Sequence, residues 1–393
     1  MKKGREFQVE CPYISQIRYG EFGKRIHNKA VIKRIPINGS IEPTFRCNLR
    51  CAHCYCNLPL NDKDAREKEL KAKEIFDILD QIAEAGCLWL LITGGEPLVR
   101  EDFLDIYTYA KKKGFIITLF TNGTLLTPQI ADYLAEWPPF AVEITLYGIT
   151  KETYEKVTQT PNSFERCVRG INLLLQRKIP LRLKTMVMKL NQDQVWQIKE
   201  YAEELGVEFR FDSVLNPRLD GSKDPCDLRL SPEEVVELDL ADKKKFTQWQ
   251  EFSSKFREPV GSDKLYYCLA GISSFHIDPY GKLSVCMMSR FQNCDLHNNS
   301  FREMWNHRIP QFLDLKPVRS YPCGECDLIS LCGQCPGSAW LETGSPETPV
   351  QYLCQLAHLR ARAFRKEINE KNGQKVEVCE SKKAVSETTN KSS

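Results

Sequence analysis

The sequence lacks a long apolar run, a large net charge and an internal repeat. No apolar stretch approaches the roughly 20 residues that a membrane-spanning helix requires. The basic start, Met1–Glu6, is not followed by the hydrophobic segment of a secretion signal. The net charge at pH 7 is only +3, which gives no reason to expect binding to nucleic acid or to an anionic membrane. We therefore expect a cytoplasmic protein whose partners are neither nucleic acids nor membranes.

Cysteine, in contrast, is abundant, with 17 among 393 residues. In a reducing compartment, clustered cysteines bind metal more often than they form disulfides. Many of them fall into two groups, a triplet within residues 47–54 and a C-terminal set within residues 268–354. The scattered remainder is expected to behave as small buried hydrophobic residues: Cys11, Cys56, Cys87, Cys167, Cys226, Cys294 and Cys379.

Residues 38–212 alternate between short apolar runs and amphipathic stretches, which predicts alternating strands and helices. Six strand–helix units favour a parallel sheet that curves into a partial (β/α)6 barrel, because a full barrel needs eight units. Strands are predicted at 40–44, 88–93, 115–120, 142–146, 181–188 and 207–211. Helices are predicted at 68–85, 102–113, 127–136, 163–176 and 192–205.

The chain outside this α/β region divides by composition. Its length is sufficient for one large core and a smaller second domain. We predict an N-terminal extension (1–37), a bridging segment (213–265), a smaller cysteine-rich domain (266–365) and a polar tail (366–393), flexible at its end. Within the extension, Gln8–Glu10 and Ala30–Ile32 are candidates for the two strands of a β-hairpin.

Cys47, Cys51 and Cys54 stand in the run Cys-Asn-Leu-Arg-Cys-Ala-His-Cys-Tyr. Three thiolates can hold three irons of a [4Fe–4S] cluster from one loop, and the fourth iron is then free to bind a small molecule. The spacing resembles that of the radical SAM superfamily, in which an aromatic residue, here Tyr55, follows the last cysteine. His53 and Cys56 are not expected to be ligands, because a fourth protein ligand would block the open iron.

The resemblance implies the chemistry. S-adenosylmethionine (SAM) would bind the open iron through its amine and carboxylate. Reduction of its sulfonium would give methionine and a 5′-deoxyadenosyl radical, which abstracts a hydrogen atom from the substrate. An electron donor such as flavodoxin or ferredoxin is therefore an expected partner.

The candidate SAM contacts lie where predicted strands end, and sites of parallel α/β folds form at that edge. Gly94, Gly95 and Glu96 follow the second strand, and the resemblance assigns them to the methionyl amine. An isolated Gly-Gly pair is more often only a tight turn. The candidates for the ribose and the carboxylate are Thr121 and Asn122 after the third strand, Thr145 on the fourth, and Lys184 on the fifth.

The C-terminal cysteines resemble those of the SPASM domain, an extension of radical SAM enzymes that usually carries two auxiliary [4Fe–4S] clusters. The resemblance assigns one cluster to Cys323, Cys326, Cys332 and Cys354, and the other to Cys268, Cys286 and Cys335. The second set has only three ligands, so either Cys226 or Cys294 completes it, or one of its irons is open to a substrate thiolate. Counting the SAM-binding cluster, three clusters are predicted. A structural zinc site is the alternative for the two Cys-x2-Cys pairs.

Function is predicted from the same resemblance. SPASM extensions most often mark enzymes that modify ribosomally made peptides, and auxiliary clusters indicate net oxidation. We therefore predict a maturase that cross-links or rearranges a precursor peptide. Met287 and Met288 follow Cys286 at the place where sulfatase-maturing relatives have a carboxylate base, which counts against that reaction, although Asp278 or Asp295 could substitute for that base. A general base is not assigned.

Two alternatives stay open at this point. One is a dehydrogenase or dehydratase that acts on a small molecule, and the other is a non-catalytic scaffold that binds zinc. For the maturase, a separate small leader-binding protein is an expected partner. The 46 residues before Cys47 are too few for the winged-helix domain with which many relatives bind a leader peptide.

Overall fold

The structure is a computed structural model that describes residues 19–56, 58–255, 264–318 and 320–371. These residues divide into two compact units. The first comprises the described residues of Met1–Leu230, Val260–Glu325 and Gln334–Val350, and the second those of Ser231–Pro259, Cys326–Gly333 and Gln351–Ser393. No helix in the described part of the chain has both the length and the apolar character needed to cross a membrane.

The first unit is built on a nine-stranded sheet with the order β11-β10-β9-β1-β4-β5-β6-β7-β8. Six of its strands pair in parallel and in chain order, as the sequence predicted. They are β1 (Asn38–Ile41), β4 (Trp89–Ile92), β5 (Ile116–Thr121), β6 (Ala141–Thr145), β7 (Leu181–Met186) and β8 (Glu208–Asp212). The partial α/β barrel is therefore confirmed.

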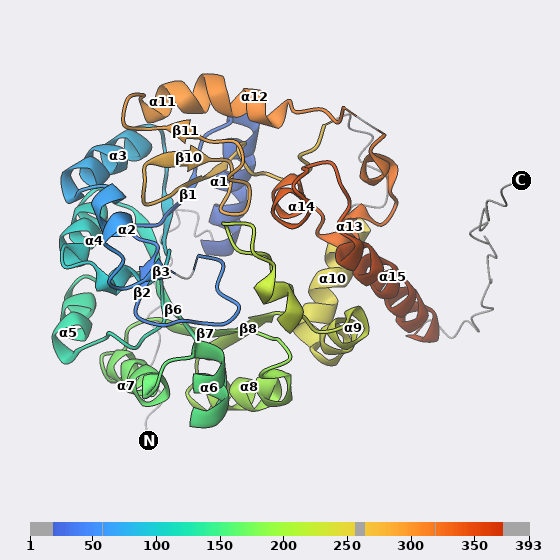
Figure 1. Cartoon of the computed structure of the whole chain (residues 1–393), viewed down its shortest axis with the longest axis horizontal. Coiled ribbons are helices and arrows are strands. Elements are labelled where there is room, and N and C mark those ends of the chain that lie inside the picture. Colours follow the sequence, from blue (N-terminus) through green and yellow to red (C-terminus); the bar gives the residue numbers. More distant parts are fainter. Residues whose placement is uncertain (1–18, 57, 256–263, 319, 372–393) are drawn as a thin grey trace, which may run out of the picture. The chain divides into compact units, whose positions relative to one another are not determined.

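Helices cover the outer face of these strands (Figure 1). Strand residues alternate between fully and partly buried, as in β5, where Ile117 and Leu119 are buried beneath the helices. In α3, Ile75, Ile78 and Ile82 form the buried face. The helices are α3 (Ala72–Glu84), α4 (Phe103–Lys112), α5 (Pro128–Glu136), α6 (Lys151–Thr158), α7 (Ser163–Gln176) and α8 (Val195–Glu204).

Most predicted helices are confirmed, with two differences. The helix predicted over 68–85 begins only at Ala72 as α3, because Glu69 and Lys71 are extended, and the helix before them, α2 (Lys63–Lys68), was not predicted. Helix α6 was not predicted, because its eight residues are mostly polar and only Tyr154, Val157 and Thr158 are buried. Short 3-10 helices complete the first unit: η1 (Pro97–Val99), η2 (Gln192–Gln194), η3 (Asp224–Leu228) and η5 (Pro322–Glu325).

The sheet continues into the region where a separate cysteine-rich domain was predicted. β9 (Ser274–Ile277) pairs in parallel with β1, and β10 (Lys282–Ser284) and β11 (Cys294–Asp295) follow in antiparallel pairing. Three short helical segments come next, α11 (Phe301–Glu303), η4 (Met304–Arg308) and α12 (Ile309–Leu313), and α14 (Pro336–Thr343) lies further along. The first auxiliary cysteine loops are thereby built on the same sheet as the barrel.

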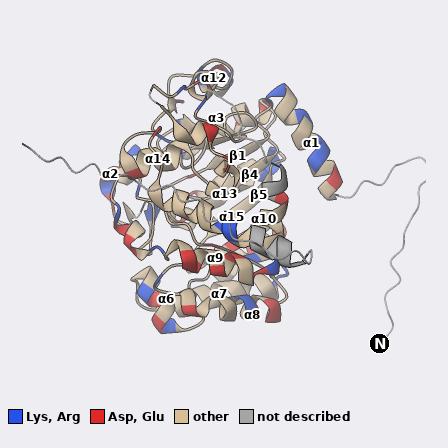
Figure 2. Cartoon of the chain, turned by 90° about the vertical axis from the view of Figure 1, so that its right-hand side faces the viewer, with Lys and Arg blue, Asp and Glu red and all other residues tan. Residues whose placement is uncertain are grey.

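The N-terminal extension contains a helix, α1 (Tyr19–Lys33), so the strand predicted at Ala30–Ile32 is wrong. The helix packs on the sheet through His27, whose ring centroid lies 4.7 Å from that of Trp89, and Ala30 is buried. Its Lys and Arg residues alternate with other residues along the helix (Figure 2). The other predicted strand, Gln8–Glu10, lies outside the described residues.

The second unit is a group of helices, α9 (Pro232–Ala241), α10 (Lys243–Lys255), α13 (Ile329–Cys332) and α15 (Gln351–Lys371). Helix α9 begins with a capping box formed by Ser231 and Glu234. A buried ion pair joins two of the helices, with Arg360 Nη2 2.9 Å from Asp239 Oδ2. The segment predicted as a turn-rich bridge, 213–265, therefore contains two helices.

Candidate active site

The cysteine triplet lies in the loop that follows β1. Cys47 belongs to β2 (Arg46–Cys47), which pairs with β3 (Leu58–Pro59). Burial raises the pKa of Cys47 to about 12 and that of Cys51 well above its usual value, and the charge of Cys54 raises both further. The three thiols are therefore close enough to interact. Ionising them costs free energy without a metal, and a bound metal would offset this cost by stabilising the thiolates.

The triplet is not arranged for a single metal ion. Within the described ranges, no three side chains of His, Cys, Asp or Glu converge as a single-ion site would require. Ligands of a cluster bind different irons and stand further apart than the ligands of one zinc ion. A cluster held by the three thiols therefore remains a prediction.

The two glycines after β4 allow two loops to touch. Gly94 has φ +123°, and a Cβ atom there would lie 2.4 Å from the carbonyl oxygen of Thr44. At Gly95 a Cβ atom would lie 2.3 Å from the carbonyl oxygen of Arg46. The Gly95 amide donates to Thr44 O at 2.8 Å, and the Glu96 amide donates to Arg46 O at 2.9 Å. The Gly-Gly pair therefore fastens this segment to the backbone just before Cys47, and its contact with SAM remains a prediction.

Glu96, Thr121 and Asn122, which the sequence singled out separately, meet in one place. The Glu96 carboxylate is fully buried and accepts hydrogen bonds from Thr121 Oγ1 (2.7 Å), the Asn122 amide (2.7 Å) and the Leu98 amide (3.1 Å). Burial raises the pKa of Glu96 to about 7, although these three hydrogen bonds work against the shift. Asn122 Nδ2 in turn donates to Cys47 Sγ at 3.7 Å. The carboxylate is thus linked to the triplet through Asn122.

The remaining candidates, Thr145 and Lys184, are register neighbours on β6 and β7. Lys184 Nζ lies 2.9 Å from the ring centroid of Phe120 and 3.9 Å from Glu143 Oε2. Burial lowers the pKa of Lys184 well below its usual value, while Glu143 raises it. These two side chains belong to the barrel strands rather than to the Glu96 network.

Sequence reasoning missed a second buried carboxylate, Glu42, which directly follows β1. Its Oε1 accepts from the Tyr55 hydroxyl at 2.5 Å, and its Oε2 lies 3.1 Å from His276 Nε2 and 2.8 Å from Arg290 Nη2. Burial alone would raise its pKa, but His276 and Arg290 outweigh burial and lower the pKa of Glu42 to about 2. Only its place at a strand end hinted at a role, because its charged partners His276 and Arg290 are 234 or more residues away in the sequence.

A third buried carboxylate, Glu69, holds the start of the same loop. It accepts from the Thr44 hydroxyl and from two nitrogens of Arg46, at 2.9 and 3.0 Å. Arg100 Nη1 lies 3.6 Å away. Glu69 therefore holds the residues just before Cys47, and Glu42 holds Tyr55, just after Cys54.

His53 and Cys56 lie within the loop as well. His53 Nδ1 is buried and makes no hydrogen bond within the described part of the chain, and burial lowers the pKa of His53 to about 4. Its ring centroid lies 4.9 Å from that of Tyr147. Cys56 Sγ lies 3.9 Å from Cys54 Sγ. That neither residue binds the cluster remains a prediction.

Cys268, Cys286 and Cys335 also come together, all within the first unit. Burial raises the pKa of Cys286 to about 11, and the charges of Cys335 and Cys268 add to the rise. Gly337 permits the approach, because a Cβ atom there would lie 2.8 Å from the backbone of Met288. Cys335 is thereby held against the loop that follows Cys286.

The groups that act on the pKa of the two candidate fourth ligands, Cys294 and Cys226, are not the thiols of Cys268, Cys286 or Cys335. Cys294 lies on β11, and Arg308 is the charged group that acts on its pKa. Cys226 lies in η3, where Arg229 and Glu342 act on its pKa. The geometry thus gives no support to either as a ligand.

The remaining auxiliary cysteines are divided between the units. Cys326, Cys332 and Cys354 belong to the second unit, where burial raises the pKa of Cys354, the charge of Cys326 raises it further, and a hydrogen bond with Cys332 lowers it. Cys323 belongs to the first unit. The four-ligand set therefore remains a prediction.

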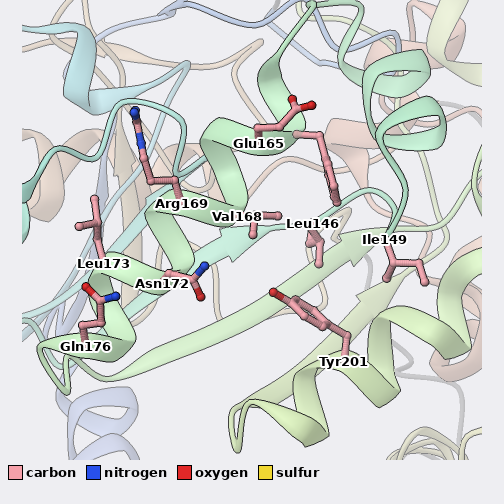
Figure 3. A pocket seen from close by; sticks show the side chains of 10 residues that line it. Leu146, Ile149, Glu165, Val168, Arg169, Asn172, Leu173, Gln176 and Tyr201 are labelled. Carbon is pink, nitrogen blue, oxygen red and sulfur yellow. The ribbon is translucent and has the colours of Figure 1, made fainter.

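A groove with a volume of about 610 Å³ lies elsewhere, between α7 and α8 (Figure 3). Apolar side chains such as Phe164 and Leu173 line it, and the side chain of Tyr201 on α8 points toward Asn172 of α7 (Figure 3). It contains none of the candidate site residues.

Comparison with known proteins identifies the family of this part of the chain. Residues 41–203, which contain the triplet and the Glu96 network, match the model of the Radical SAM superfamily. The chain is a radical SAM enzyme. Its radical SAM domain is followed by a cysteine-rich C-terminal region.

Two kinds of curated relative resemble this radical SAM enzyme along most of its length. It is 27% identical to the AdoMet-dependent heme synthase of Methanosarcina barkeri over 340 residues, which cover 77% of this chain and 92% of the relative. It is 28% identical to the mycofactocin maturase MftC of Mycobacterium tuberculosis over 335 residues, which cover 82% of this chain and 84% of the relative.

Solved structures share its fold. Streptococcus suis SuiB bound to precursor peptide SuiA superimposes with a TM-score of 0.65 at 17% identity, over 90% of this chain and 84% of SuiB. The structure of anSMEcpe with bound AdoMet gives a TM-score of 0.61 at 18% identity, over 86% of this chain and 100% of that one. The likeness therefore extends beyond the radical SAM domain.

Proposed function

We propose that this radical SAM enzyme oxidatively modifies a ribosomally made precursor peptide, by forming a cross-link or by rearranging its backbone. The observation that carries the proposal is the open side of the barrel. β8 is an edge strand of the sheet, and Glu208, Arg210 and Asp212 along it are exposed. An extended peptide can approach a barrel from such an edge. The similarity to MftC and the fold shared with peptide-bound SuiB support this choice.

In this proposal the two ends of the site have separate tasks. Cys47, Cys51 and Cys54 would hold the SAM-binding cluster, which together with SAM would supply the radical that takes a hydrogen atom from the substrate. The candidate SAM contacts are Gly94, Gly95, Glu96, Thr121, Asn122 and Thr145. The buried Glu96 carboxylate, already held by three donors, is suited to accept one more from an amine.

The C-terminal cysteines supply the oxidising end. Cys268, Cys286 and Cys335 are proposed to hold one auxiliary cluster through three thiolates, and Cys323, Cys326, Cys332 and Cys354 the other. A substrate radical must lose an electron to give an oxidised product, and a cluster near the barrel can accept it. We further propose an external electron donor of the flavodoxin or ferredoxin kind and a separate leader-binding protein.

The test uses the anaerobically reconstituted enzyme, SAM, a reductant and a candidate precursor peptide, chosen from short reading frames next to its gene. A peptide lighter by two hydrogens, seen by mass spectrometry together with 5′-deoxyadenosine, is the expected result for a cross-link. The Cys47→Ala/Cys51→Ala/Cys54→Ala variant is the control and should give neither. 5′-Deoxyadenosine without any change in the peptide would contradict the proposed substrate.

A second candidate is a small-molecule reaction, as in the dehydrogenase or dehydratase alternative. The similarity to AdoMet-dependent heme synthase favours a tetrapyrrole as the small molecule. An iron porphyrin that binds in the barrel would show a shifted Soret band and would be consumed with SAM. If the porphyrin changes and the peptide does not, this second function holds.

A further inference from the structure

One buried carboxylate connects the loops of two cysteine sites. Glu42 is 0% exposed and accepts from the Tyr55 hydroxyl at 2.5 Å, and Tyr55 directly follows Cys54. On its other oxygen, Glu42 pairs with Arg290 Nη2 at 2.8 Å. Arg290 lies four residues after Cys286. The Glu42 side chain therefore contacts both the loop of Cys47, Cys51 and Cys54 and the loop that follows Cys286.

The charge of Arg290 is compensated by this contact. Its Nε donates to the carbonyl oxygen of Met287 at 2.7 Å, which fixes the guanidinium against the residue after Cys286. Nη1 is buried and makes no hydrogen bond within the described residues, Nη2 faces Glu42 Oε2 at 2.8 Å, and the side chain is only 14% exposed. A buried cation without compensation is costly, so the ion pair with Glu42 is what compensates it.

The position of the pair determines what it can influence. Cys286 interacts with Cys268 and Cys335, so the guanidinium lies on the loop of this three-thiol site. Reduction potentials of iron–sulfur clusters respond to nearby net charge and to hydrogen bonds around the ligands. Electrostatic effects are strong where side chains are buried, because screening by water is weak.

We propose that Glu42 is a positioning residue that sets the reduction potential of an auxiliary cluster at Cys268, Cys286 and Cys335, by masking the charge of Arg290. The inference rests on the proposed function, because it requires a cluster at these three cysteines. Loss of the Glu42 charge exposes the cation and favours the reduced cluster. Loss of the Arg290 charge has the opposite effect.

The chain offers a matched control in Glu69. Its side chain is only 5% exposed, and its carboxylate also accepts from a hydroxyl and pairs with guanidinium groups, those of Arg46 and Arg100. In the sequence, Arg46 directly precedes Cys47 and Arg100 lies four residues after Glu96, so neither partner belongs to the loop that follows Cys286. A general loss of packing would follow from either substitution, whereas an effect on the auxiliary cluster would follow from Glu42 alone.

The experiment is a potentiometric titration of the reconstituted full-length protein, monitored by electron paramagnetic resonance. The auxiliary signal should shift to a higher potential in Glu42→Gln and to a lower potential in Arg290→Gln. The double variant should return close to the wild type, because the two charges are removed together. In Glu69→Gln the auxiliary potential should stay unchanged.

The outcomes separate the inference from the function on which it rests. An unchanged auxiliary potential in Glu42→Gln at full iron content overturns the inference, as does an equal shift in Glu69→Gln. If Glu42→Gln does not load iron, Arg290→Gln and the double variant still test the sign of the effect. A wild-type protein without an auxiliary signal overturns the proposed cluster first, and this inference with it.

Discussion

The two cysteine regions are organised in different ways. The three N-terminal cysteines lie within eight consecutive residues of one loop. The C-terminal set extends over residues 268–354 and is divided between two compact units. In the first region the local sequence alone brings the thiols together. In the second region a strand pairing, β9 with β1, and the close approach at Gly337 are required. The comparison teaches that local sequence is sufficient to bring together the ligands of one loop, whereas ligands far apart in the chain come together only through tertiary structure.

The largest expected effect concerns the N-terminal loop. Cys51→Ala removes a ligand that lies between the other two in the sequence. The SAM-binding cluster should therefore be lost, which lowers the iron content by about four irons per chain. SAM cleavage should fall to the level of a protein-free control. Iron analysis and chromatography of 5′-deoxyadenosine check this. Normal SAM cleavage by the variant would refute the role of the triplet.

The corresponding change in the C-terminal region should separate SAM cleavage from product formation. Cys286→Ala should lose up to about four irons but retain SAM cleavage, because the N-terminal loop is intact. The oxidised product should disappear. Equal loss of both activities would show that the two regions are not independent.

Gly95→Ala probes how the N-terminal loop is held. The added Cβ atom would meet backbone oxygen at 2.3 Å, so the loops must separate, at a cost of about 1–3 kcal/mol in unfolding free energy. The SAM-binding cluster should load poorly while the auxiliary signal persists. Gly23→Ala in α1 is the control, since a Cβ atom there meets nothing within 4 Å. Equal stability losses in both variants would contradict the account.

Glu96→Gln tests the electrostatics of the same loop. The pKa of Glu96 rises from 4.5 to about 7 on folding, so the native state binds more protons than the unfolded state between these values. Stability should therefore fall as pH rises from about 4.5 to 7, by on the order of 3 kcal/mol. The variant should lack this slope. Urea unfolding of the metal-free protein at several pH values measures it, and equal slopes in both proteins would contradict the assignment.

The smallest expected effect is that of Cys294→Ser. Cys294 is buried on β11, so a hydroxyl there should lower the unfolding free energy by about 1–3 kcal/mol and leave iron content and the auxiliary signal unchanged. A changed auxiliary spectrum would instead identify Cys294 as the fourth ligand.

Much of the barrel could be predicted from the sequence. Its strands are short apolar runs, and its helices carry one apolar face, so periodicity located β4 and α7 within a residue or two. Helix α6 escaped because its burial depends on neighbours rather than on its own pattern. Ala30–Ile32 has the composition of a strand, but packing of His27 against Trp89 places it in a helix.

The candidate site was predictable to a similar extent. Glu96, Thr121 and Asn122 could be named because each follows a strand, and strand ends meet at one edge. Glu42 and Arg290 could not be paired in advance, because they are joined only through the contact of β9 with β1. No local pattern reports a contact between residues so far apart in the chain.

The most direct test of the central claim is iron analysis and electron paramagnetic resonance of the Cys47→Ala/Cys51→Ala/Cys54→Ala variant. If the C-terminal region holds its own clusters, the wild type should bind about 12 irons per chain and the variant about 8, with an auxiliary signal that persists. A variant without iron, or one with zinc in the C-terminal region, would contradict the account.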